Sequence, residues 1–363
     1  MKLIQFNLGD TRARKIYDQL IDDSPLGFVQ QSSYWADTIT KNGDNEAIFI
    51  MIERNGVAIG GLPLYIFSGP IGSVLTSIPG AGPLGGVVVR AGEVIEPIYA
   101  TLLEGLHNLA EEKHCIASTI ISNPLKNDLS LYEKLFVPDF VFENFTQVLK
   151  IEDAIIDGNW ILKNNRNRNP KKNIIKAKEA GFSSKLCEDL IEFKRWVRIH
   201  EQRHQEIGIK PLPEPLLTSI YTDLCQRDRG FLQLVMKGDE IAAGCLFVHH
   251  REICDAFMLS VNSKFSNQSP NYYLIQEAMF TMWRRGIRYF NWQSSPSRES
   301  GVYSFKRQWG SRDIPYYFLT KIYCDIEKFL CLGLDGLKEG YCDNFVVPYG
   351  IFESKKIEKF YQK

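Results

Sequence analysis

The pattern of apolar and polar residues predicts two β-hairpins far apart in the chain. Residues 47–67 read AIFIMIERNGVAIGGLPLYIF, and residues 231–249 read FLQLVMKGDEIAAGCLFVH. In each segment two apolar runs flank a turn that contains glycine, which is typical of a hairpin. The second runs align without gaps, Val57–Leu62 against Ile241–Leu246. We therefore expect the same element in both halves of the chain.

A helix and a further strand follow each predicted hairpin. In the first half, residues 95–113 predict a helix and residues 116–121 a strand. In the second half, a strand over 253–261 precedes a helix that begins at Ser269-Pro270 and ends at Gly286, and residues 287–292 predict the next strand. The apolar face of this second helix has helical spacing and comprises Leu274, Ile275, Ala278, Met279, Met282 and Trp283. The repetition, about 180 residues apart, predicts an internal duplication.

Length and composition agree with two packed domains. The chain has 363 residues, of which 44% are hydrophobic, and typical domains hold 100–200 residues. We place the domains at 1–151 and 152–316, with a C-terminal extension over 317–363. The expected fold class is α/β, with mixed α+β sheets in both domains.

The charge balance argues against a strongly basic nucleic-acid binder. Lys+Arg and Asp+Glu both number 43. The one basic run, 163–178, contains Lys163, Arg166, Arg168, Lys171, Lys172, Lys176 and Lys178 and no acidic residue. The eight cysteines form no C-x-x-C pair, as expected of free thiols in a reducing cytoplasm. We expect neither a signal peptide nor a transmembrane segment, and contact with a membrane surface stays open.

Four segments carry a family resemblance. Phe28–Trp35 is similar to an F-x-Q-S-x-x-W motif, and Asn173–Gly181 is similar to an R-x-I-R-K-A-x-x-x-G helix. Glu201-Gln202-Arg203 stands where T-x-x-R is frequent, and Tyr303–Gly310 is similar to a closing F-K-x-x-F/W-G motif. In this order they resemble the FemAB family, which also includes acetyltransferases described as BioF2-like. Its fold is two tandem GNAT-like (acyl-CoA N-acyltransferase-like) domains.

The chain departs from the ordinary GNAT pattern at two places. The loop that binds the pyrophosphate of acetyl-CoA in GNAT proteins is rich in glycine and precedes a helix N-terminus. Here the equivalent segment, Ser263–Asn271, contains no glycine, and Pro270 lacks a backbone N–H. Where the FemAB family has Asp-x-x-Gly, this chain has Asn291–Ser294.

The resemblance implies transfer of an acyl or aminoacyl group onto an amine of a cell-envelope, polysaccharide or peptide precursor. The donor is then acyl-CoA or aminoacyl-tRNA as a co-substrate, with no permanently bound cofactor. The expected partners are the amine-bearing acceptor, held in a cleft between the domains, and tRNA, but not DNA.

The resemblance also assigns roles to residues. Lys306 is expected to stabilise the tetrahedral intermediate, and Phe305 to shape the pocket. Arg203 is suited to clamp a phosphate or carboxylate of the acceptor, since its guanidinium binds such groups bidentately. The aromatic residues expected to build the acceptor cleft are Trp35, Tyr303 and Trp292. Apart from the resemblance, the basic run that holds Lys171, Lys172 and Lys176 favours a solvated linker and helix face, with phosphate binding by these lysines as the alternative.

Two other functions stay open. His200-Glu201-Gln202-Arg203-His204 matches the H-E-x-x-H motif of zinc peptidases, in which both histidines lie on one face of a helix. Gln202 and Arg203 occupy positions that are usually apolar in such helices, and no third-ligand helix follows. We therefore expect no metal site. The second alternative is a GNAT-like binding module without catalytic activity.

Overall fold

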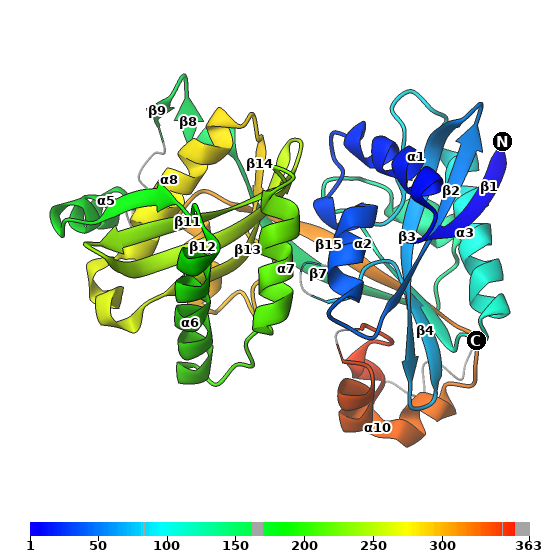
Figure 1. The fold of residues 1–363 in the computed structure, drawn as a ribbon. Coiled ribbons are helices and arrows are strands. Elements are labelled where there is room, and N and C mark those ends of the chain that lie inside the picture. Colours follow the sequence, from blue (N-terminus) through cyan, green and yellow to red (C-terminus); the bar gives the residue numbers. More distant parts are fainter. Residues whose placement is uncertain (81, 83, 162–169, 343, 353–363) are drawn as a thin grey trace. The chain divides into compact units, whose positions relative to one another are not determined.

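The computed structural model describes residues 1–80, 82, 84–161, 170–342 and 344–352 (Figure 1). The chain forms two compact units. Unit 1 comprises Met1–Asn144 and Pro315–Lys363, and unit 2 comprises Phe145–Ile314. The sequence placed the boundaries after 151 and 316 and treated 317–363 as an extension. In the structure the residues from Pro315 onward belong to unit 1.

Unit 1 contains one mixed sheet. Its strands lie in the order β1 (Lys2–Asn7), β2 (Glu46–Arg54), β3 (Val57–Gly69), β4 (Gly72–Thr76), β6 (Ala117–Ile121) and β15 (Arg312–Ile322). The short β5 (Val88–Val89) pairs with β3. Neighbours are antiparallel except β4 and β6, which are parallel. The helices are α1 (Thr11–Asp22), α2 (Ser33–Thr40), α3 (Ile95–Glu112), α4 (Leu129–Leu135) and α10 (Glu327–Gly340). Two 3₁₀ turns, Val29–Gln31 and Tyr349–Phe352, complete it.

Alternation along β2 explains how both faces of this sheet are covered. Ile48, Ile50 and Ile52 belong to the core that includes Leu102 and Leu106 of α3. The intervening Phe49 and Met51 belong to a second core with residues of α1. Since consecutive side chains of a strand point to opposite faces, one apolar run needs helices on both sides.

Unit 2 repeats this plan. Its strands lie in the order β7 (Phe140–Lys150), β14 (Tyr289–Asn291), β13 (Ile253–Val261), β12 (Glu240–His250), β11 (Gly230–Lys237) and β10 (Ser183–Leu186). β13 and β14 are the parallel pair. The helices are α5 (Pro170–Glu179), α6 (Leu190–Glu206), α7 (Glu214–Cys225), α8 (Pro270–Arg284) and α9 (Gly301–Arg307). A small hairpin joins β8 (Ile155–Ile156) to β9 (Asn159–Trp160), and 3₁₀ turns span Ile151–Asp153 and Ser263–Gln268.

Packing against β12 fixes where the helices of unit 2 lie. Ala243 and Cys245 share a core with Leu274 and other residues of α8. Gly244, between them, faces Trp196 of α6, and a Cβ atom at Gly244 would lie 2.4 Å from the Trp196 ring. The glycine therefore lets α6 approach the sheet on the face opposite to α8.

The two predicted hairpins are confirmed. β2 pairs with β3 around Asn55-Gly56, both at positive φ as a type I′ turn requires. β11 pairs with β12 around Gly238. In each unit a helix follows the three antiparallel strands and leads to a strand parallel to the third. The repeated order of elements in the sequence thus corresponds to two similar folds.

Candidate active site

The strands β13 and β14 of unit 2 diverge after a short parallel pairing. The two strands pair only over Ile253–Asp255 and Tyr289–Asn291. Beyond this point β13 continues to Val261, whereas β14 ends and the segment from Trp292 onward leaves the sheet. Gln293 then adopts a left-handed conformation, with φ of 62°. Such a conformation is strained for any residue other than glycine, and strained residues cluster at functional sites.

Lys306 of α9 holds this turn. Its Nζ atom donates hydrogen bonds to the carbonyl oxygens of Gln293 (2.9 Å) and Ser294 (2.7 Å). The side chain is only 7% exposed, and burial lowers the pKa of the Lys306 ammonium from 10.5 to about 8. Because an ammonium group has three N–H donors, one remains for a further acceptor.

Gln293 was missed as a functional residue by the sequence reasoning. Its side-chain Nε2 atom is buried and finds no hydrogen-bond partner among the described residues. A buried amide without a partner is costly, so such groups are rare unless a ligand or water satisfies them. The sequence carried one hint, because Gln293 lies in the Asn291–Ser294 segment that departs from the family pattern.

Aromatic rings line the chain around Lys306. Phe305 contacts Trp292 with ring centroids 5.8 Å apart, and Tyr272 of α8 at 5.1 Å. Trp309 lies 6.2 Å from Trp292. Trp292 is 4% exposed and its indole N–H has no partner in the described structure. Trp292 and Trp309 belong to the core of unit 2 and Phe305 packs against it, so the pocket-shaping role of Phe305 and Trp292 stays a prediction.

Tyr303 links α9 to a polar network on its other side. Its hydroxyl donates to Asp313 at 3.1 Å, and Arg298 donates to the same carboxylate oxygen at 3.1 Å. The carbonyl oxygen of Tyr303 accepts from the amide of Gln147, which in turn accepts from Ser295 at 2.7 Å. Tyr303 therefore positions the segment that carries the Lys306 contacts.

Buried hydrogen bonds hold the C-terminal end of β14 in place. Asn291 donates to Asp255 at 2.7 Å and accepts from Thr146. Its Oδ1 atom also accepts from the backbone N–H of Gln293 at 3.1 Å. Asn291, Asp255 and Thr146 are all at most 1% exposed. This network sets the direction in which the chain enters the Gln293 turn.

Arg203 and Lys176 contact a different part of unit 2. Arg203 lies near the end of α6 and pairs with Glu206 at 3.0 Å, and Glu206 also accepts from Ser263 at 3.0 Å. Lys176 of α5 donates to the carbonyl oxygen of Asn267 at 2.6 Å. Both contacts converge on the loop between β13 and α8, which is where GNAT proteins hold their donor.

The remaining residues that the sequence predicted for the site lie far from Lys306 in the sequence. Lys171 and Lys172 are exposed on α5. Lys163, Arg166 and Arg168 of the basic run lie outside the described residues. Trp35 is buried at 1% exposure in α2 of unit 1, where its backbone N–H is capped by Ser32.

His200 of the H-E-x-x-H motif is a core residue. It is fully buried, its Nδ1 atom lies 3.0 Å from the Ser260 hydroxyl, and burial together with His204 lowers its pKa from 6.5 to about 4. His204 contacts the carbonyl oxygen of His200 at 2.9 Å. Among the described residues, no group of three or more His, Cys, Asp or Glu side chains is placed to hold a metal ion.

Within the described ranges, every helix is too short or too polar to traverse a lipid bilayer.

The comparisons with known proteins identify the fold. A family described as "Acetyltransferase (GNAT) domain" matches residues 164–307. FemX superposes with a TM-score of 0.69 at 14% identity, covering 88% of this chain and 97% of that one. The C-terminal domain of a putative lysylphosphatidylglycerol synthetase from Agrobacterium fabrum gives 0.60 at 10% identity, with 93% and 100% covered. A tandem GNAT protein from the clavulanic acid biosynthesis pathway gives 0.53 at 12%, with 89% and 99% covered.

No curated protein matches the chain. The fold of the two units and the matched domain agree with the resemblance drawn from the four sequence segments. Residues 164–307 match a GNAT acetyltransferase domain, and the fold of the chain is similar to those of FemX and of a tandem GNAT protein.

Proposed function

We propose that unit 2 transfers an acyl or aminoacyl group onto an amine of a cell-envelope, polysaccharide or peptide precursor. The observations that carry the proposal are the buried Lys306 ammonium, which donates to the Gln293 carbonyl oxygen where β13 and β14 diverge, and the buried Gln293 side-chain amide, which has no hydrogen-bond partner within the described part of the chain. A cation and a neutral N–H donor in a site of low polarity are suited to a developing oxyanion.

The proposed reaction needs few other groups from the protein. The uncharged amine nitrogen attacks the carbonyl carbon of the donor, and a C–N bond forms while the carbonyl oxygen takes the negative charge. The third N–H of Lys306 and the Gln293 amide hold that oxygen. When the intermediate collapses, the C–S or C–O bond of the donor breaks, and the amine proton leaves with the departing thiol or hydroxyl group. Phe305 and Trp292 exclude water from this step.

The donor is acyl-CoA or aminoacyl-tRNA. Both carry phosphates, and the loop between β13 and α8 is flanked by the basic helix α5 through the Lys176–Asn267 contact. Lys171, Lys172 and Lys176 are the residues we expect to meet those phosphates. Arg203 reaches the same loop through Glu206, which supports a role for Arg203 near the donor as much as near the acceptor. Because both donors are cytoplasmic, we place the reaction in the cytoplasm.

A transfer assay with two labelled donors tests the proposal. Labelled acyl-CoA and labelled aminoacyl-tRNA are offered in parallel, with amino sugars and peptidoglycan precursors as acceptors. Label in an amide product from either donor supports the proposal and identifies the donor. If the tRNA is the donor, Lys171→Gln combined with Lys172→Gln and Lys176→Gln should raise its KM. No product from either donor, together with unchanged cellular function in a Lys306→Ala strain, would instead favour a binding module.

A further inference from the structure

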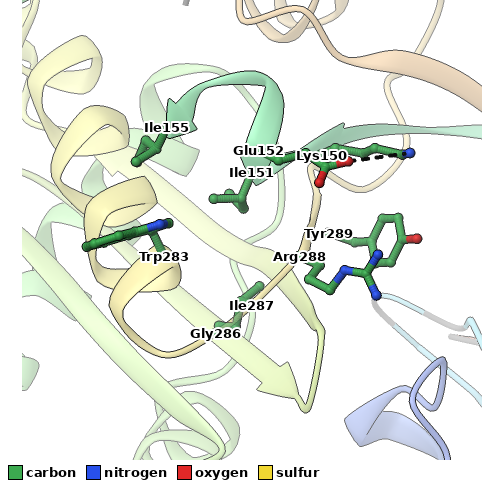
Figure 2. Close-up of a pocket in the computed structure, with 9 residues that line it drawn as sticks. All are labelled: Lys150, Ile151, Glu152, Ile155, Trp283, Gly286, Ile287, Arg288 and Tyr289. Carbon is green, nitrogen blue, oxygen red and sulfur yellow. Dashed lines mark ion pairs between the residues drawn. The ribbon is translucent and has the colours of Figure 1, made fainter. Parts of the chain in front are cut away.

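A cavity lies in unit 2, at the end of β14 that begins with Tyr289 (Figure 2). Its volume is about 230 Å³, and it is formed by the end of β7, the turn after it and the segment that joins α8 to β14. The Gln293 turn follows β14 at the opposite end of the strand. The cavity is thus separate from the proposed transfer site, and nothing in the reaction described above uses it.

One wall of the cavity is apolar. Ile151, Ile155 and Ile287 are each at most 3% exposed and form its inner surface. Trp283, near the end of α8, is 39% exposed and stands beside them. The backbone of Gly158 covers part of this ring, since a Cβ atom there would lie 3.3 Å from it. A large indole held in this way and left open toward a cavity offers a preformed surface for an apolar group.

The opposite wall carries both signs of charge (Figure 2). Arg288 is paired with Glu252 at 3.1 Å, and its side chain remains 59% exposed. Lys150 and Glu152 face each other at 3.7 Å, and the Glu152 side chain is 66% exposed. Pairs this exposed contribute little stability, so their partners exchange readily with those of a ligand. A ligand with an anionic and a cationic group can therefore replace Glu252 at Arg288 and Lys150 at Glu152.

We propose that this cavity binds a free α-amino acid with a branched aliphatic or aromatic side chain. The side chain packs against Trp283 and the isoleucines, the α-carboxylate pairs with Arg288, and the α-ammonium pairs with Glu152. The volume is smaller than that of sites for drug-sized ligands and suits a molecule with a single side chain. A zwitterion replaces both present partners at once, its carboxylate taking the place of Glu252 at Arg288 and its ammonium that of the exposed Lys150 at Glu152.

Calorimetric titration of the full chain with L-leucine and L-phenylalanine tests the proposal without any assay of activity. Two analogues show which charges matter, because 4-methylpentanoate lacks the ammonium group and 3-methylbutylamine lacks the carboxylate. We expect a Kd below about 10 mM for at least one of the two amino acids. The Kd of both analogues should be at least about tenfold higher. An absence of heat with both amino acids, or equal binding of the analogues, would overturn the assignment.

Variants locate the site. Trp283→Ala and Arg288→Gln should each weaken binding by at least about tenfold, whereas Arg284→Gln, on the same helix but outside the lining, should not. Thermal unfolding of each variant confirms that it is folded, and the exposed Arg288 serves if Trp283→Ala does not fold. Binding that persists unchanged in Arg288→Gln would place the amino acid elsewhere and contradict the proposal. These outcomes do not depend on whether unit 2 transfers acyl groups.

Discussion

Lys306 Nζ lies 2.9 Å from the backbone carbonyl oxygen of Gln293, and this contact joins the two residues on which the proposed chemistry depends. It connects α9 to the turn that follows β14. Because Gln293 is held at a positive φ, its carbonyl points to the lysine while its side-chain amide stays unpaired among the described residues. The contact thus fixes the Lys306 ammonium and the backbone of Gln293, the two residues whose donors we assign to the oxyanion.

Replacing Gln293 by glycine should separate strain from function. Glycine adopts φ of 62° without strain, so the free energy of unfolding should be unchanged or higher by up to about 1 kcal/mol. The lost amide donor should lower kcat for transfer by about tenfold to a hundredfold. Denaturant unfolding and steady-state kinetics measure the two effects. Full activity in Gln293→Gly would show that the side-chain amide does not contact the reacting group.

The pH dependence of transfer should reflect Lys306. Burial places the pKa of this ammonium at about 8, so its cationic form is lost as the pH rises through that value. We expect kcat to fall above about pH 8 in the wild type. Lys306→Arg should lack this decline even if it is slow, because arginine stays protonated. The same decline in both proteins would assign it to another group.

The contribution of Lys306 to the free energy of unfolding should rise with pH, whereas kcat should fall. The folded pKa of Lys306 is about 8 and the ordinary value is 10.5, so between these values the unfolded chain binds more protons. Stability relative to Lys306→Met should therefore rise from pH 8 to pH 10.5. Urea unfolding of both proteins across this range measures the difference, and a flat difference would mean that the lysine is not desolvated.

Acid should destabilise unit 2 through His200. Its folded pKa is about 4 and the ordinary value is 6.5, so its contribution to stability is present above pH 6.5 and is lost as the pH falls toward 4. This corresponds to a loss of about 3 kcal/mol at most. His200→Gln should reduce the loss between pH 7 and pH 5, whereas His107→Gln, on a half-exposed side chain, should not. Identical acid sensitivity in wild type and His200→Gln would contradict the burial of a neutral imidazole.

Gly244→Ala should destabilise unit 2 by about 1–3 kcal/mol, because the added methyl group would force Trp196 away from the sheet. Gly43→Ala is the control, since a Cβ there would meet its nearest neighbour at an ordinary 3.7 Å. The shift in urea midpoint measures both. An unchanged midpoint in Gly244→Ala would mean that α6 can move away from the sheet without a loss of stability.

Local patterns were sufficient to predict the repeated part of the fold. The Asn55-Gly56 turn and the apolar face of α8 depend on residues close in sequence, and both elements appear where periodicity placed them. The C-terminal segment could not be assigned in this way. Phe318 pairs with Ile121 although the whole of unit 2 lies between them in the sequence, and no local signal specifies that pairing.

The site was predictable only in part for the same reason. Lys306, Phe305 and Tyr303 came from a motif contained in one helix. The role of Gln293 depends on its backbone angle and on contacts with α9, which a residue pattern does not encode. The H-E-x-x-H motif shows the converse, since its spacing is that of a metal site while burial against Ser260 makes His200 a core residue.

The most direct test of the central claim is the rate of label transfer by Lys306→Met, measured with the donor and acceptor that the wild type uses. Methionine fills a similar volume and removes the ammonium group. We predict that kcat falls about a hundredfold or more while the unfolding transition is retained, and that Lys134→Met, on an exposed lysine of unit 1, transfers at the wild-type rate. Equal rates in wild type and Lys306→Met would contradict the assignment of this lysine to the oxyanion.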